Sequence, residues 1–131
     1  MFQATVLSGA GGKNVHVQVN GTLSKGETVL DWNRVVGMEE VSHDGHLRLD
    51  AVTFAISDKM EVWLGWDVAG GDPPVFLPLQ GRGFLNFESM GGVKPAGVEG
   101  RTGDVLLYAF GPESPSPRHF LLMLDFSKQR G

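Results

Sequence analysis

Apolar and polar side chains alternate along much of this chain with a period of two residues. Val15, Val17 and Val19 are separated by polar residues, and the same alternation recurs in short stretches further along. Successive side chains of a strand point to opposite faces, so this alternation predicts strands with one buried face. About eight strands are expected, over Gln3–Leu7, Val15–Val19, Leu47–Ile56, Val62–Val68, Val75–Leu79, Phe84–Phe87, Val105–Phe110 and Phe120–Phe126.

Turn residues separate these stretches. Glycine makes up 19 of the 131 residues, and Asn20-Gly21 and Asp44-Gly45 are dipeptides that favour tight hairpin turns. Many short strands joined by turns predict an all-β fold, which is a β-sandwich, a jelly-roll-like fold or a small barrel. We expect residues 1–131 to form a single domain, of which the glycine-rich residues 1–13 form a flexible N-terminal arm.

Two interpretations of Thr28–Glu40 stay open. Trp32, Val35 and Val36 have helical spacing, and Asp31 before them is a suitable N-cap for one short helix. The same residues are equally compatible with an extended segment that leads into the next turn.

Two of the expected strands are apolar on both faces. They contain the runs Val105–Tyr108 and Phe120–Leu124. Such strands lie at the centre of a sheet, or have their second face covered by another element or another subunit.

The charge and composition of the chain exclude several classes of partner. The formal net charge of −4 argues against binding to a nucleic acid backbone or to an anionic membrane surface, because both need clustered basic residues. The chain has no cysteine, which excludes disulfides and cysteine-based metal sites. The longest apolar run, Phe120–Leu124, is too short to cross a bilayer, and the N-terminal residues do not have the pattern of a signal peptide. We therefore expect no nucleic acid partner and no membrane partner.

Candidate chemistry is sparse. His43, Asp44 and His46 place two imidazoles and a carboxylate close together, but the spacing offers no third metal ligand, and the residues are better explained as the flanks of a solvated turn. No serine or cysteine stands in the context of a catalytic nucleophile. The sequence therefore predicts no catalytic residue, no cofactor and no metal site.

One segment invites comparison with the cupins. Pro95–Gly100, followed by Gly103–Val105, resembles the second cupin motif and its following strand. The metal-binding histidine that the motif requires is replaced by Gly100. A cupin-like metal enzyme is therefore the least favoured of three functional interpretations.

Binding surfaces are expected on loops and on one tryptophan. The loops Glu88–Gly103 and Gly111–Arg118 are long, and rich in glycine and in proline respectively. The two tryptophans at positions 63 and 66 are an odd number of residues apart, so one is expected in the core and the other at the surface, as an anchor for a protein or a sugar. The candidate partner-binding residues are Trp63, Trp66, Lys94, Pro95, Glu99, Arg101 and Arg118.

The second half of the chain resembles a group of small structural proteins encoded among the head and tail genes of tailed bacteriophages. The resemblance spans Glu61–Phe126. It is carried by Trp63-Leu64-Gly65-Trp66-Asp67, by Leu77–Gly83, by Gly100–Leu107 and by His119–Phe126.

That resemblance implies a non-enzymatic virion protein, foremost a capsid decoration or cement protein. Its expected partner is the major capsid protein or another virion protein, its expected state a homo-oligomer, and its expected location the virion, assembled in the host cytoplasm. The alternative is a carbohydrate- or receptor-binding β-module of a phage tail or an adhesin, which predicts an exposed aromatic platform.

Overall fold

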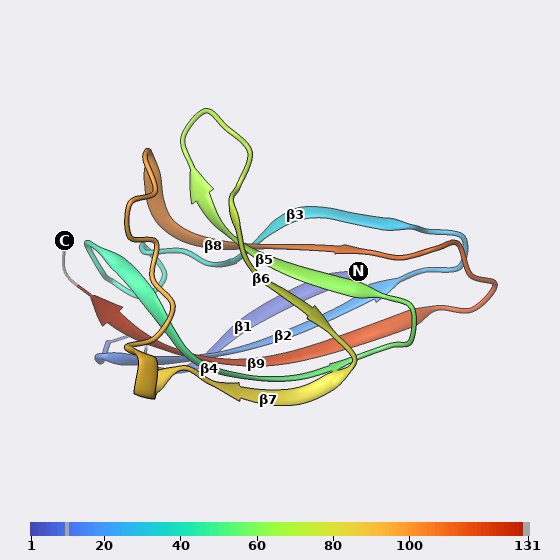
Figure 1. Ribbon diagram of the computed structural model, residues 1–131, viewed down its shortest axis with the longest axis horizontal. Coiled ribbons are helices and arrows are strands. Elements are labelled where there is room, and N and C mark those ends of the chain that lie inside the picture. The colour runs from blue at the N-terminus through green and yellow to red at the C-terminus, as the bar shows by residue number, and fades with distance from the viewer. Residues whose placement is uncertain (10, 130–131) are drawn as a thin grey trace.

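Two antiparallel sheets packed face to face make up the molecule (Figure 1). The computed structural model describes residues 1–9 and 11–129. Sheet A has five strands in the order β1-β2-β9-β4-β7, and sheet B has four in the order β3-β8-β5-β6. The strands are β1 (Phe2–Ser8), β2 (Asn14–Leu23), β3 (Val29–Val36), β4 (His46–Ile56), β5 (Glu61–Val68), β6 (Val75–Gln80), β7 (Arg82–Asn86), β8 (Arg101–Phe110) and β9 (Arg118–Gln129). The expected all-β sandwich is confirmed.

The core lies between the two sheets and is built from the alternating positions of the sequence. Val15, Val17 and Val19 of β2 are buried, as are Val62 and Leu64 of β5. They pack with the inward side chains of β8 and β9, such as Leu107 and Leu122. Burying such side chains contributes roughly 1.5–3 kcal/mol each, before the entropy of ordering them is subtracted.

The two strands that are apolar on both faces lie at the centres of their sheets, which is the first of the two positions expected for them. β9 lies between β2 and β4, and β8 lies between β3 and β5. Their inward positions are fully buried, whereas their outward positions are only partly covered. The second apolar face of each strand is therefore the outer surface of the sandwich.

Of the two interpretations of residues 28–40, the short helix is wrong and the extended segment is correct. Val29–Val36 form β3, which pairs with β8, and a turn follows at residues 38–42. The strand has register shifts between Leu30 and Asn33 and between Arg34 and Val36, so its apolar residues do not follow the strict alternation of a regular strand. A bulge adds a residue to one strand, so it breaks the period of two that identifies a strand in sequence.

The dipeptide Asn20-Gly21 does not form a turn. It lies inside β2, where Gly21 pairs with Phe120 of β9 and Phe2 of β1. A Cβ on Gly21 would lie 2.1 Å from the Phe120 ring, so the ring occupies the space that any other residue would need for its side chain. Glycine inside a strand often marks a close approach of this kind.

Part of the expected N-terminal arm, residues 1–13, forms the strand that was also expected there. Phe2–Ser8 pair with β2 as β1, and position 10 lies outside the described residues. Asp44-Gly45 forms a bend, but it leads from sheet B into sheet A and is not a hairpin between neighbouring strands.

Candidate functional site: the aromatic face of sheet B

Four aromatic rings gather on the outer surface of sheet B. Tyr108 and Phe110 alternate with the buried Leu107 and Ala109 along β8, so both rings point away from the core. β5 is in register with β8, which sets Trp63 beside Tyr108. Trp32 of β3 lies on the other side of Tyr108. We call Trp32, Trp63, Tyr108 and Phe110 the aromatic face.

The rings contact one another across three strands. The centroid of Tyr108 lies 5.3 Å from that of Trp32, 5.9 Å from that of Trp63 and 5.8 Å from that of Phe110. Trp63 and Phe110 meet edge to face at 4.9 Å. Tilted and edge-to-face pairs at these separations contribute about 0.5–1.5 kcal/mol each beyond the area they bury. The rings therefore hold one another in fixed positions while each stays partly exposed.

A glycine makes room for this arrangement. Gly65 pairs with Leu106 and points to the same surface, where a Cβ would lie 2.9 Å from the six-membered ring of Trp32. The edge of the Trp32 indole therefore lies close to the backbone of β5 at Gly65. A side chain at position 65 would lift the indole off the sheet.

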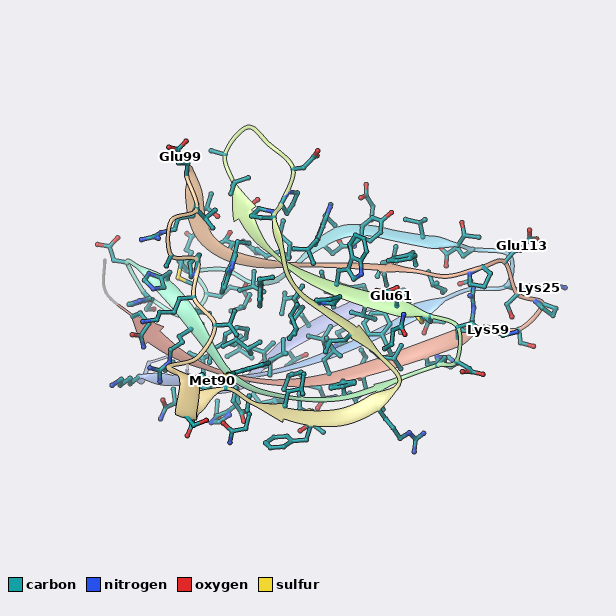
Figure 2. All side chains as sticks on the ribbon, viewed as in Figure 1. Lys25, Lys59, Glu61, Met90, Glu99 and Glu113 are labelled. Carbon is teal, nitrogen blue, oxygen red and sulfur yellow. The ribbon has the colours of Figure 1, made fainter. Side chains whose placement is uncertain are left out.

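A shallow hollow opens at one end of the aromatic face. Its volume is about 340 Å³, and its lining is Thr28, Val29, Trp32, Trp63, Tyr108, Phe110 and Gly111. Polar groups stand beside it: the indole Nε1 of Trp63 donates a hydrogen bond of 2.9 Å to the Glu61 carboxylate, which also accepts one of 3.1 Å from the Gln80 amide. Figure 2 shows Glu61 on β5 in the middle of the molecule. An apolar hollow with a few polar groups at its side is suited to binding a ligand or a partner side chain.

The predicted partner-binding residues do not form one surface. Trp63 belongs to the aromatic face, whereas Trp66 is 2% exposed and stacks on Phe76 in the core at 4.0 Å. The expectation that the two tryptophans occupy opposite faces is confirmed. Trp66 offers no accessible surface to a partner.

The two loops lie far apart. Glu99 and Glu113, which belong to the loops Glu88–Gly103 and Gly111–Arg118, stand at opposite ends of the sandwich in Figure 2. In the first loop Lys94 and Glu99 are exposed, but Pro95 is buried, and its carbonyl accepts a hydrogen bond of 2.8 Å from Arg101 Nη1. That contact fixes the conformation of the loop.

Arg118 is enclosed at the other end. It is 7% exposed, and its Nη2 donates to the Glu27 carbonyl at 2.7 Å, which ties the loop before β3 to the start of β9. Its Nε and Nη1 have no hydrogen-bond partner among the described residues. Arg118 therefore joins loops and does not present a charge at the surface.

The histidine pair is less exposed than a solvated turn would be. His46 is 8% exposed, and its Nδ1 has no hydrogen-bond partner among the described residues. Burial lowers the pKa of His46, and the nearby charges of Arg101, His43 and Lys94 lower it further. His43 Nε2 lies 2.6 Å from the carbonyl oxygen of Gln129. No group of three His, Cys, Asp or Glu within residues 1–9 and 11–129 is arranged to hold a metal ion, and no helix in this range is long and apolar enough to span a membrane.

Sequence reasoning missed three of the four rings of the aromatic face. A signal for two of them was present: Leu106, Tyr108 and Phe110 alternate with Val105, Leu107 and Ala109, so one face of this strand is the bulkier one. Trp32 could not be added, because the register of β3 against β8 depends on its bulges.

Comparison with known proteins adds no relative. No protein-family model matches this chain, and no curated protein matches it at significant similarity.

Proposed function

We propose that this protein is a non-enzymatic structural component of a virion, a capsid decoration protein that attaches to the shell through the aromatic face of sheet B. The virion assignment rests on the resemblance of Glu61–Phe126 to phage structural proteins. The attachment surface rests on one observation, which is that four mutually packed aromatic rings stand on the solvent side of a sheet.

Aromatic rings held in place before binding are effective anchors. Tryptophan and tyrosine are enriched among the residues that dominate binding energy, and a side chain that is already ordered loses little entropy when a partner arrives. The hollow between Trp32, Trp63 and Phe110 accepts an apolar side chain of the shell protein. Attachment would stabilise the assembled shell by mass action, without any chemical turnover.

Particle binding tests the proposal. Shells from the source, stripped of this protein, are mixed with the wild-type chain, with Trp63→Ala and with Leu121→Ala, which alters the outer surface of sheet A. We expect regular labelling of the head by the wild type and by Leu121→Ala, and at least tenfold weaker binding by Trp63→Ala.

Two outcomes contradict it in different ways. No particle-associated protein at all overturns the virion assignment. Binding by Trp63→Ala as tight as by the wild type leaves the assignment in place and overturns the aromatic face as the attachment surface.

The polar groups beside Trp63 favour a second candidate, a carbohydrate-binding module. A pyranose stacks its apolar side on an indole and offers hydroxyls to neighbouring polar groups, and the Glu61 carboxylate and Gln80 amide stand next to Trp63. On this proposal a glycan array shows binding at about micromolar to millimolar Kd, lost in both Trp63→Ala and Glu61→Gln. An array without any binding glycan contradicts it.

A further inference from the structure

The four edge strands of the sandwich are not equally protected. β6 carries Pro78, which cannot donate a backbone hydrogen bond to an added strand. β3 carries two register shifts, and β1 carries one between Val6 and Ser8. Bulges and prolines on edge strands discourage a further strand from pairing there.

β7 has none of these features. Arg82–Asn86 pair with β4 without a register shift, and all five residues are exposed. Phe84 is 59% exposed, the largest value among the aromatic rings of the described residues. β7 forms the lower rim of sheet A in Figure 1, with no strand beyond it.

The hydrogen bonds of β7 identify its free groups. At one end the Ile56 amide donates to the Gly81 carbonyl at 2.7 Å, and at the other the Phe87 amide donates to the Asp50 carbonyl at 2.7 Å. Alternate residues of an antiparallel strand bond the same neighbour, so Gly83 and Leu85 face β4. The amide and carbonyl groups of Arg82, Phe84 and Asn86 therefore point outward, and no described residue bonds them.

The outer surface of sheet A becomes more apolar toward this edge. Phe84 pairs with Thr53, and Thr53 pairs with Met123, which is 36% exposed. On the β2 side the same surface is polar, with a hydrogen bond of 2.6 Å between His16 Nδ1 and the Asp125 carboxylate. The exposed ring of Phe84 thus lies beside the unpaired backbone of β7.

We propose that β7 pairs antiparallel with β7 of a second copy of this chain, about a two-fold axis at Phe84. In that register Phe84 lies opposite its own copy, and Arg82 lies opposite the second copy's Asn86. Arg82 then comes close to the second copy's Glu88, which is exposed two residues beyond. Neither Arg82 nor Glu88 has an ion pair among the described residues, and the symmetry forms the contact twice.

No like charges meet in this register, which favours a second copy over an arbitrary strand. The five-residue contact is smaller than a standard interface of about 1,600 Å². We therefore expect a weak dimer, with a Kd of about 10–500 µM. Dimers then form where the local concentration is high, as on a repeating surface.

The pairing has a geometric consequence. Strand pairing joins the two copies of sheet A into one sheet of ten strands, so both copies of sheet B lie on the same side of it. The two aromatic faces then point in the same direction and can engage one partner surface together. This consequence rests on the proposed function, whereas the dimer itself does not.

Sedimentation of the purified chain over a range of concentrations up to about 1 mM tests the dimer. We expect a monomer–dimer equilibrium for the wild type. Phe84→Pro removes an outward amide and the exposed ring but no hydrogen bond to β4, so it should leave the β4–β7 pairing and the unfolding midpoint unchanged while it abolishes dimers. Phe84→Ala keeps that amide and serves as the matched control, which should dimerise more weakly than the wild type but measurably.

If the proline variant does not fold, a second pair of variants that exchanges the charges at positions 82 and 88 still tests the proposal. Arg82→Glu should weaken dimerisation at least tenfold, and Arg82→Glu combined with Glu88→Arg should restore it to within about threefold of the wild type. A wild type that stays monomeric, assemblies larger than dimers, or a lack of restoration by the second substitution would each overturn the proposal. Trp63→Ala should dimerise like the wild type, which separates failure of this inference from failure of the proposed function.

Discussion

The outer surfaces of the two sheets use their apolar side chains differently. On sheet B, Trp32, Trp63, Tyr108 and Phe110 contact one another, and each is partly covered by its neighbours. On sheet A, Leu121 and Met123 are 40% and 36% exposed and stand among short or polar residues.

This difference separates two ways in which an exposed apolar surface arises. Rings that pack together stabilise the fold and at the same time form a rigid surface for a partner. Isolated aliphatic side chains contribute little to the fold, and become significant only when something covers them. We therefore expect substitutions on sheet B to affect both stability and binding, and those on sheet A to affect association alone.

The largest effect on stability is expected from the loss of Trp63, one of the four rings of the aromatic face. Trp63→Ala removes contacts with Tyr108 and Phe110 and should lower the free energy of unfolding by about 2 kcal/mol. Leu121→Ala, its counterpart on sheet A, should change it by less than about 0.5 kcal/mol. Urea unfolding measures both, and equal losses would remove the distinction between the two surfaces.

A substitution at Gly65 is a second test of whether the packed rings of sheet B stabilise the fold. Gly65→Val should displace the Trp32 indole and lower the free energy of unfolding by about 1–2 kcal/mol, because the Cβ would lie 2.9 Å from that ring. Tryptophan fluorescence should shift to longer wavelength as Trp32 becomes exposed. Wild-type fluorescence and stability in this variant would mean that Trp32 does not depend on the glycine.

A double-mutant cycle sharpens the contrast. Trp32→Ala and Tyr108→Ala, alone and together, should give a coupling energy of about 0.5–1.5 kcal/mol, since the two ring centroids are 5.3 Å apart. A cycle of Leu121→Ala and Phe84→Ala, which lie on opposite sides of β4 on sheet A, should give a coupling close to zero. A coupling on sheet A as large as that on sheet B would contradict independent side chains there.

The smallest effect is expected from pH, and it should fall on sheet A. Burial lowers the pKa of His46 at the start of β4, so the folded state binds fewer protons there than the unfolded state. The contribution to stability is therefore present above the usual histidine pKa of about 6.5 and is lost as pH falls through the folded value. Hydrogen exchange measured at about pH 7.5 and 5.5 should show that local opening at this end of β4 increases at the lower pH, and that it increases more there than in β5 or β8. His46→Gln should remove the dependence, and its persistence would assign the effect to another group.

Local pattern was enough to find most of the strands. Apolar and alternating runs located the stretches that became β1, β2 and β4 to β9, and most of these strands have one face against the core, whereas β7 is exposed throughout. It failed at β3, where bulges break the period, and at Asn20-Gly21, where a distant ring explains the glycine. Both failures have the same cause: the deciding contact comes from a strand far away in sequence.

The candidate site was less accessible to such reasoning. Trp63 was identified, but its neighbours Trp32 and Tyr108 come from strands whose order no local signal determines. Charged loop residues such as Lys94 and Arg118 were selected by composition, and the structure separates them to opposite ends of the sandwich. A surface made by strand order can be found only when the order is known.

The position of β9 has a consequence for how the chain is made. β9 is the last described strand in sequence, yet it joins the β1–β2 pair to the β4–β7 pair at the centre of sheet A. While the ribosome is still making Arg118–Gln129, these two pairs have no common neighbour, and sheet A stays in two halves. Synthesis adds about 5–20 residues per second, so the halves are exposed to chaperones and to aggregation for seconds. A nascent chain stalled before residue 118 would lack the strand that completes the sheet.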